Sequence, residues 1–316
     1  MKRFGKTIAV ISMILLTGVF FGCSKEAPAA DTAGAATAEK IKMGMSFQDM
    51  NNPYFVTMHE AVEEAAEALD AELYVTDARH DVNKQISDIE DMVIKGIEIL
   101  LINPTDSVGV AGAVETAKKA GVIVVAVDAQ AEGPIDSFVG SKNYDAGLKA
   151  GEFMADYLKG SGKVAILDGI PVVPILERVR GFRDAVANYP GIEIVDVQNG
   201  KQERDFALTV TENMIQAHPE LDAVFSVNDG GALGSLAAIE SSGKDIALVS
   251  VDGHPEAVDA IVKGTAFKAT VAQYPRDQVR IGVGIAFARY LGAIVPNVIP
   301  TDVKLLTKEN AKGFSW

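Results

Sequence analysis

Two hydrophobic periods alternate along most of the chain. Short stretches that are apolar at alternate positions, or apolar throughout, predict strands, whereas apolar residues at every third or fourth position predict helices. The predicted strands are 41–47, 72–76, 97–102, 122–127, 164–167, 193–197, 223–227, 246–251 and 267–271. The predicted helices are 53–69, 82–95, 108–120, 144–159, 175–188, 206–217, 232–242, 255–262 and 276–291.

This alternation predicts an α/β fold with parallel sheets and right-handed crossovers. The strands are too many for one doubly wound sheet of usual size, so we expect two similar lobes that meet near residues 141–144. A hydrophobic content of 48% is enough to form a core in each lobe. Several of the predicted strands are continuously apolar, which is typical of strands buried on both faces.

The first residues have the pattern of an export signal. Residues 1–6 are basic and residues 7–21 are apolar, a run too short to span a membrane. The run ends at Cys23, the only cysteine, which in this place resembles the lipid-modified cysteine of bacterial lipoproteins. We therefore predict a lipoprotein signal peptide at 1–22 and a flexible tether at 23–40. A plain signal peptide cleaved near Ala29 and Ala30 is the alternative.

Charge and residue types exclude several functions. The net charge of −14 becomes −17 once residues 1–22, with three cations and no acids, are removed, which disfavours nucleic-acid binding. A single cysteine excludes an internal disulfide, the histidines lack metal-ligand spacing, and no acidic run has calcium-loop spacing. Ser46, Ser141 and Ser226 have no paired histidine, so nucleophilic catalysis has no candidate. From these features together we expect no enzyme, no metal and no cofactor. We interpret the glycine-containing segment 159–163 as a turn, because it precedes a strand where a phosphate-binding loop would follow one.

Polar residues follow the predicted strands at one topological place. Ligands of open α/β sheets bind outside the carboxyl ends of the strands, so these side chains are candidates for binding a polyhydroxylated ligand. They are Asn103, Asp128, Asn228, Asp252 and Gln273. Helix capping and turn formation are the alternative roles for any one of them.

The segment Asn52-Pro53-Tyr54-Phe55 combines a helix start with two aromatic rings. Asn is a favoured N-cap and Pro is favoured in the first helical turn. A polar cap beside two rings suits a ligand with hydrophilic edges and an apolar face, such as a sugar. Ordinary packing of both rings at a helix N-terminus is the alternative.

Several segments together resemble one family. The chain is similar to the ribose-binding protein and its relatives, the pentose- and hexose-type periplasmic binding proteins of ABC importers, from about residue 41 to 306. The segments that carry the resemblance are 52–55, 99–107, 127–130, 177–178, 217–219, 223–229, 251–253 and 272–273. The resemblance implies two Rossmann-like lobes joined by three crossovers, near 141–143, 273–275 and 300–302, which close around one sugar.

The resemblance also implies lobe boundaries and ligand-binding residues. The N-terminal lobe would comprise 41–142 and 274–300, and the C-terminal lobe 143–273 and 301–316. The implied ligand-binding residues are Asn52, Tyr54, Phe55, Asn103 and Asp128 in the first lobe, Arg178, Asn228 and Asp252 in the second, and Gln273 at the hinge. Further candidates are Ser46, Gln130, Lys142 and Gln202.

This sequence departs from the ribose pattern around the site. Ala129 stands where the family has Arg, Lys142 where it has Asp, and Val251 and Gln202 where it has Phe. Two extra residues also lengthen the loop before Asn52. These departures leave ribose, another pentose, a hexose and a sugar alcohol as alternative ligands.

The resemblance implies a transport function. We expect a monomeric extracytoplasmic protein, anchored to the membrane by lipid on Cys23, that captures a monosaccharide or sugar alcohol by hinge closure and delivers it to an ABC permease. A sensory protein of the same fold, presenting a sugar or furanose-like signal to a membrane receptor, is the alternative. A LacI-type repressor would need a helix-turn-helix where this chain has a signal peptide.

Overall fold

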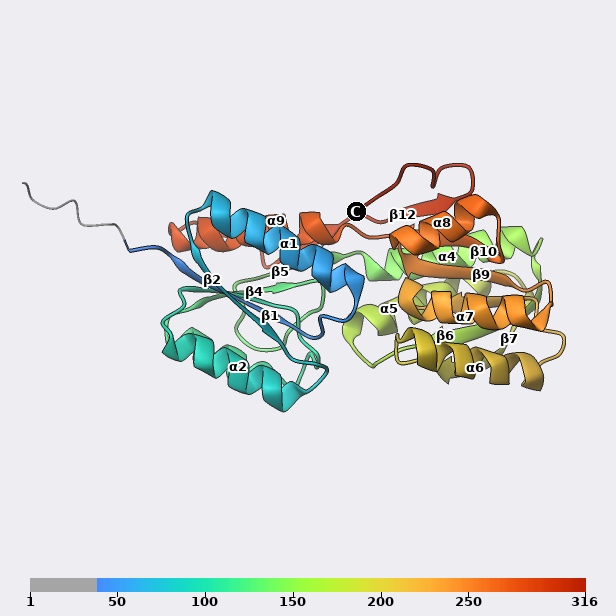
Figure 1. Cartoon of the computed structure of the whole chain (residues 1–316), viewed down its shortest axis with the longest axis horizontal. Coiled ribbons are helices and arrows are strands. Elements are labelled where there is room, and N and C mark those ends of the chain that lie inside the picture. The colour runs from blue at the N-terminus through green and yellow to red at the C-terminus, as the bar shows by residue number, and fades with distance from the viewer. Residues whose placement is uncertain (1–38) are drawn as a thin grey trace, which may run out of the picture. The chain divides into compact units, whose positions relative to one another are not determined.

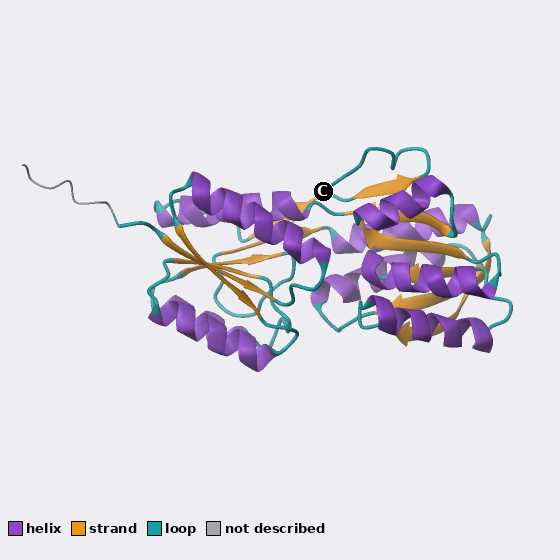
Figure 2. Ribbon diagram, in the orientation of Figure 1, coloured by secondary structure: helices purple, strands orange, loops and turns teal. Residues whose placement is uncertain are grey.

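The computed structural model describes residues 39–316 (Figures 1 and 2). The predicted signal peptide, Cys23 and nearly all of the predicted tether lie outside the described residues. Lys40–Trp316 form one compact unit in which strands and helices alternate. The predicted α/β fold with two mainly parallel sheets is confirmed.

The first sheet has six strands, and every neighbouring pair is parallel. In spatial order the strands are β11 (Val298–Thr301), β5 (Ser137–Ser141), β4 (Ile123–Val127), β3 (Ile99–Ile102), β1 (Lys42–Phe47) and β2 (Glu72–Asp77). The central strand β3 is buried at every residue, as its continuous apolar run predicts.

Helices cover both faces of this sheet (Figure 1). Side chains of α1 (Pro53–Ala68) and α9 (Pro275–Tyr290) join one core cluster with alternate residues of β1, β3 and β4. Side chains of α2 (Val82–Ile94) and α3 (Ala111–Lys119) join the other cluster with the remaining residues of β3 and β4. Because successive side chains of a strand point to opposite faces of the sheet, alternate residues of β3 and β4 belong to two separate cores.

The second sheet also has six strands, of which only β12 is antiparallel to its neighbour. In spatial order the strands are β12 (Lys304–Thr307), β10 (Phe267–Ala272), β9 (Ala247–Asp252), β8 (Ala223–Ser226), β6 (Ser161–Asp168) and β7 (Gly191–Asn199). One face packs on α4 (Asn143–Tyr157) and α5 (Val173–Val186). The other face packs on α6 (Arg204–Ala217), α7 (Asp229–Ser242) and α8 (Pro255–Lys263).

The chain passes between the two sheets at three places. It passes from β5 to α4, from β10 to α9, and from β11 to β12. In the first crossing Ser141 ends β5 and Asn143 begins α4, so a single residue, Lys142, links the elements. The crossings bring the carboxyl ends of strands from both sheets into one region, where the candidate site lies.

Helices α4 and α5 approach each other closely because glycine stands at their contact. A Cβ at Gly147 of α4 would lie 1.9 Å from the carbonyl oxygen of Arg178, and a Cβ at Gly181 of α5 would lie 2.1 Å from the carbonyl oxygen of Tyr144. Since Arg178 belongs to α5, this close approach sets the position from which its side chain reaches the site.

Some elements differ from the sequence prediction. The strands β5, β11 and β12 were not predicted, because each is short and β11 contains Pro300, which suits an edge strand. Helix α7 begins at Asp229 and not at residue 232, because Asn228 caps it. The interpretation of 159–163 as a turn is correct only for Lys159 and Gly160, which have positive φ, since Ser161 already begins β6.

Candidate ligand-binding site

The start of α1 forms one edge of the site. The Asn52 side chain accepts a hydrogen bond from the Tyr54 backbone N–H at 3.0 Å and caps the helix, with Pro53 in the first turn. The rings of Tyr54 and Phe55 meet edge to face with centroids 5.6 Å apart, and both are buried in the first-lobe core. The Tyr54 hydroxyl accepts a hydrogen bond from Gln278 Nε2 at 3.1 Å. Capping and packing thus account for much of this segment.

Asn103 and Asp128 follow β3 and β4 and contact each other. Asn103 Nδ2 donates to Asp128 Oδ2 at 3.0 Å, and Asn103 Oδ1 accepts from the Gln48 N–H at 3.3 Å. Ser46 at the end of β1 is fully buried, and its hydroxyl accepts from Gln85 Nε2 at 3.1 Å. The three side chains therefore lie together at the carboxyl edge of the first sheet, as the topology predicts.

Asp128 has an unusual backbone and a perturbed carboxyl group. Its φ of +65° lies in the left-handed region, which Asp and Asn tolerate better than most residues. Burial raises the pKa of Asp128 to about 6, although the guanidinium of Arg178 opposes this effect, and Asp252 adds to it. The charges of Arg178 and Asp252, which belong to the second lobe, therefore act on a carboxyl group of the first lobe.

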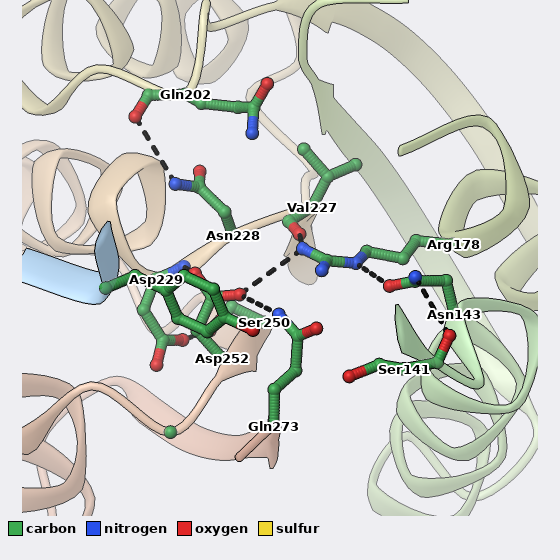
Figure 3. Close-up of polar contacts among 12 residues, drawn as sticks. Ser141, Asn143, Arg178, Gln202, Val227, Asn228, Asp229, Ser250, Asp252 and Gln273 are labelled. Carbon is green, nitrogen blue, oxygen red and sulfur yellow. Dashed lines mark hydrogen bonds and ion pairs between the residues drawn. The ribbon is translucent and has the colours of Figure 1, made fainter. Parts of the chain in front are cut away.

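Arg178 organises the second-lobe wall (Figure 3). Its Nε donates to Asn143 Oδ1 at 2.9 Å, and Nη1 donates to the Val227 carbonyl at 2.8 Å and to Asp252 Oδ1 at 3.3 Å. The Arg178 side chain is only 4% exposed. A buried guanidinium needs such partners to offset its desolvation.

Asp252 ends β9 and stands beside a second carboxyl group, Asp229. Asp252 Oδ1 also accepts from Gln273 Nε2 at 2.7 Å, and Oδ2 accepts from the Asp229 N–H at 3.3 Å. Asp229 is fully buried and accepts hydrogen bonds from Ser250, from Thr270 and from the His254 N–H. Burial raises the pKa of both carboxyl groups; Arg178 opposes the shift of Asp252, and the nearby Asp252 charge further raises the pKa of Asp229.

Gln273 carries a buried acceptor without a partner. Its Nε2 is bonded to Asp252, but its Oε1 is inaccessible and has no hydrogen-bond partner among residues 39–316. The side chain lies next to Arg178 and Asp252 in Figure 3. An unpaired buried acceptor is costly, and a ligand hydroxyl would satisfy it.

The Asn228 side chain binds the backbone of Gln202, whereas the Gln202 side chain binds the backbone of Ile170. Asn228 Oδ1 accepts from the Gly231 N–H at 3.0 Å, which caps α7, and Nδ2 donates to the Gln202 carbonyl at 3.3 Å. The Gln202 side chain accepts from the Ile170 N–H at 3.2 Å. The capping role considered for the polar residues after strands therefore applies to Asn228.

The other two candidates, Gln130 and Lys142, lie beside a cavity of about 480 Å³ next to the first crossing. Its lining residues are Gln130, Phe138, Ser141, Lys142, Asn143, Tyr144, Asp145, Val173, Pro174 and Glu177. Lys142 also pairs with Asp302 at 2.5 Å. The cavity adjoins the buried network through Asn143, which accepts a hydrogen bond from Arg178. Asp128 and Asp252 do not line it, so the charged side chains of the site lie next to the cavity and not in its wall.

Sequence reasoning missed three residues that contact the predicted set. Asp229 is absent from the candidates predicted from the sequence, although it is more deeply buried than Asp252. Gln278 in α9 donates to both Tyr54 and Ser141. Trp316 donates from Nε1 to the Asp252 carbonyl at 2.9 Å. Asp229 adjoins a predicted residue in sequence, but no sequence signal placed Gln278 or Trp316 here.

The described part of the chain contains neither a metal-binding cluster nor a membrane-spanning helix. Within residues 39–316 no group of three or more His, Cys, Asp or Glu side chains is placed to hold a metal ion. No helix in this range is both long enough and apolar enough to cross a membrane.

The fold and the polar site define a solute-binding protein. Residues 43–292 match the family model described as a periplasmic binding protein domain, which covers most of the chain. The chain therefore belongs to the periplasmic binding protein family, and the predicted resemblance, fold and non-enzymatic solute-binding class are confirmed. Membership of this family also places the protein outside the cytoplasm.

Particular relatives sharpen this assignment. The chain is 38% identical to the ribose import binding protein RbsB of Bacillus subtilis, over 98% of this chain and 100% of the relative. A solute-binding protein of an ABC transporter from Actinobacillus succinogenes, solved with bound D-allose, is 28% identical with a TM-score of 0.83 and covers 87% of this chain and 100% of its own. A Caulobacter protein solved with myo-inositol is 29% identical with a TM-score of 0.82, over 87% and 95% of the two chains.

Proposed function

We propose that this protein captures a monosaccharide or sugar alcohol between its lobes and delivers it to an ABC-type permease. The observation that carries the proposal is the buried, unpartnered Oε1 of Gln273 beside the Arg178–Asp252 pair. An acceptor, a carboxylate and a guanidinium within one small region suit a ligand rich in hydroxyl groups, each of which donates and accepts.

The residues proposed to bind the ligand are those that the sequence suggested. Asp128 and Asp252 would accept hydroxyl hydrogens, Arg178 would donate, and Tyr54 and Phe55 would supply an apolar surface. Asn52, Asn103 and Asn228 would act mainly by holding these groups, since their side chains already bond within the protein. The ligands of the relatives, D-allose and myo-inositol, have the same polyhydroxylated character.

Capture would proceed by rotation of two rigid bodies about the three crossings. We propose 41–142 with 274–300 as one body and 143–273 with 301–316 as the other. A ligand that contacts both walls would favour the closed arrangement by its differential affinity for it. The closed monomer, held at the membrane by lipid on Cys23, would then present both lobes to the permease.

A melting-temperature screen of D-ribose, D-allose, xylitol, myo-inositol and L-arabinose tests the proposal. A ligand at 100 times its Kd should stabilise the protein by about 3 kcal/mol, because it binds only the folded form. The Asp128→Ala variant should lose this shift, and Arg180→Ala, an exposed change on α5, should keep it. If none of these polyols changes the melting temperature, the proposed function is wrong.

The anchor and the oligomeric state need separate experiments. Radiolabelled palmitate should enter the full-length protein expressed in bacteria but not its Cys23→Ser variant. Sedimentation of the soluble form should give the mass of one chain. Label in the Cys23→Ser variant would contradict the anchor, and a dimer mass would contradict the monomer.

A further inference from the structure

The C-terminal segment runs along the second lobe before it reaches the site. Ala311 is fully buried in the second-lobe core that packs on α6, α7 and α8, and Phe314 packs against the same cluster. Residues 311–314 therefore fix the end of the chain to the second lobe.

The last residue contacts both walls. The Trp316 ring meets the His254 ring, on the second lobe, at 5.4 Å and the Tyr54 ring, on the first lobe, at 5.5 Å, each edge to face. Trp316 also packs against the first-lobe core that contains Tyr54 and Phe55. One side chain, held by a segment of the second lobe, thus joins an aromatic ring of the first.

The indole N–H reaches the backbone of a proposed ligand-binding residue. The Asp252 carbonyl accepts from Trp316 Nε1 and from the Gln273 N–H, both at 2.9 Å. Asp252 has a φ of +140°, which residues other than glycine rarely adopt. Two donors on one carbonyl oppose rotation of this peptide, and the same backbone directs the carboxylate toward Arg178 and Gln273.

We propose that Trp316 is a positioning residue of the ligand site, fixing Asp252 and Tyr54 relative to each other across the two lobes. The inference rests on the proposed function, since it concerns the same site. Trp316 acts through its neighbours: the N–H holds the Asp252 peptide, and the ring supports Tyr54. Loss of either should weaken ligand binding.

Affinity measurements on three variants separate the two contributions. Trp316→Phe keeps a ring but removes the N–H, and should weaken binding of the best ligand among D-ribose, D-allose, xylitol and myo-inositol by about fivefold, the loss of one net hydrogen bond. Trp316→Ala also removes the ring and should cost about tenfold or more. Lys312→Ala, a change of an exposed residue in the same segment, should change affinity by less than about twofold. Affinities of both Trp316 variants within twofold of wild type would overturn the proposal.

The single tryptophan of the chain gives a second, direct measurement. Its emission should change on addition of a binding sugar, with a midpoint equal to the Kd from calorimetry. A tail with a purely structural role would give the same emission with and without the sugar, and that result would contradict the proposal.

A ligand-free measurement distinguishes this inference from the proposed function. Acrylamide should quench Trp316 several-fold less in the native protein than in guanidinium-unfolded protein, because the ring packs on His254 and the N–H is bonded to the Asp252 carbonyl, both within the second lobe. Equal quenching in both states would overturn the inference whatever the protein binds. Protection from quenching, together with no melting shift by any polyol, would instead overturn the proposed function and support the contact.

Discussion

The site has two walls, one around Asp128 in the first lobe and one around Asp252 in the second, and their buried carboxyl groups have different partners. The first-lobe wall has one carboxyl group, Asp128, which is bonded by the neutral amide of Asn103 and has its pKa raised to about 6. The second-lobe wall has two carboxyl groups, Asp229 and Asp252, but places the Arg178 guanidinium among its partners. The comparison teaches that burial raises the carboxyl pKa on both walls, to about 6 for Asp128 and about 8 for Asp229, whereas only the second wall bonds a carboxylate directly to a cation, Arg178.

Removal of the Arg178 guanidinium should have the largest effect on stability. Arg178→Ala should lower the free energy of unfolding by about 3–5 kcal/mol, because it leaves buried carboxyl groups without their charged partner. Urea denaturation would measure the change. Arg180→Ala on the same helix removes an exposed pair with Glu177 and should cost less than about 1 kcal/mol.

A second substitution decides whether the missing charge is the cause. Asp252→Asn in the Arg178→Ala background should recover part of the lost stability, since it removes the uncompensated carboxylate. A double variant as unstable as the two single losses added together would mean that the two side chains act independently.

Removal of the Asp128 charge should raise the free energy of unfolding, whereas removal of the Arg178 charge should lower it. The pKa of Asp128 is about 6 in the folded protein against an ordinary 3.8, so the folded state retains the proton between these values and stability falls as pH rises through this window. At pH 7 the ionised group therefore lowers the free energy of unfolding by up to about 3 kcal/mol. Asp128→Asn, which also tolerates a positive φ, should recover most of this amount.

The pH dependence provides the check on Asp128. The stabilisation by Asp128→Asn should be present at pH 7 and absent below pH 3.8, where the group is protonated in both states. Sugar affinity of the wild type should also fall as pH drops through 6, if the carboxylate accepts ligand hydroxyls. A variant equally stabilised at both pH values would show that charge is not the reason.

A change that widens the spacing between α4 and α5 should have an intermediate effect on stability. Gly181→Ala would place a Cβ 2.1 Å from the Tyr144 carbonyl and should destabilise the protein by about 1–3 kcal/mol by forcing α4 and α5 apart. The melting temperature should fall, and sugar affinity should fall as well, because Arg178 would move with α5. In the first lobe, Gly112→Ala meets nothing within 4 Å and should be neutral or stabilising by up to about 1 kcal/mol. Similar effects at the two positions would contradict the close-packing argument.

The smallest effect is expected at the exposed edge between the walls. Lys142→Ala breaks the pair with Asp302, whose side chain is 85% exposed, so the melting temperature should stay within error of wild type. Sugar affinity, measured by calorimetry, should fall less than about fivefold. A larger loss would place the ligand in the 480 Å³ cavity that Lys142 lines.

The sequence was most informative where one local rule decides the structure. The buried strands followed from continuous apolar runs, and the start of α1 followed from Asn52 and Pro53, whose capping role is confirmed. The short edge strands β5, β11 and β12 lacked such a signal, because their pairing joins segments far apart in sequence.

The same limit applies to the site. Residues that directly follow strands were found, since parallel topology alone brings Asn103, Asp128 and Asp252 to the carboxyl edges. Their actual partners depend on side-chain packing that no local pattern encodes: Asn228 is occupied as a cap, Asp229 has the deepest burial, and Trp316 arrives from the end of the chain. The ligand-binding roles of Asp128 and Asp252 stay predictions.

The three crossings also set an order for folding. The strands β6 to β10 of the second sheet come from the continuous segment 161–272, whereas β5 of the first sheet pairs with β11, whose residues are made about 160 positions later. During synthesis the second lobe can assemble most of its sheet while the first still has an open β5 edge, which is prone to pairing with other chains. Such distant pairing has a high contact order, so completion of the first lobe should be the slow step of folding.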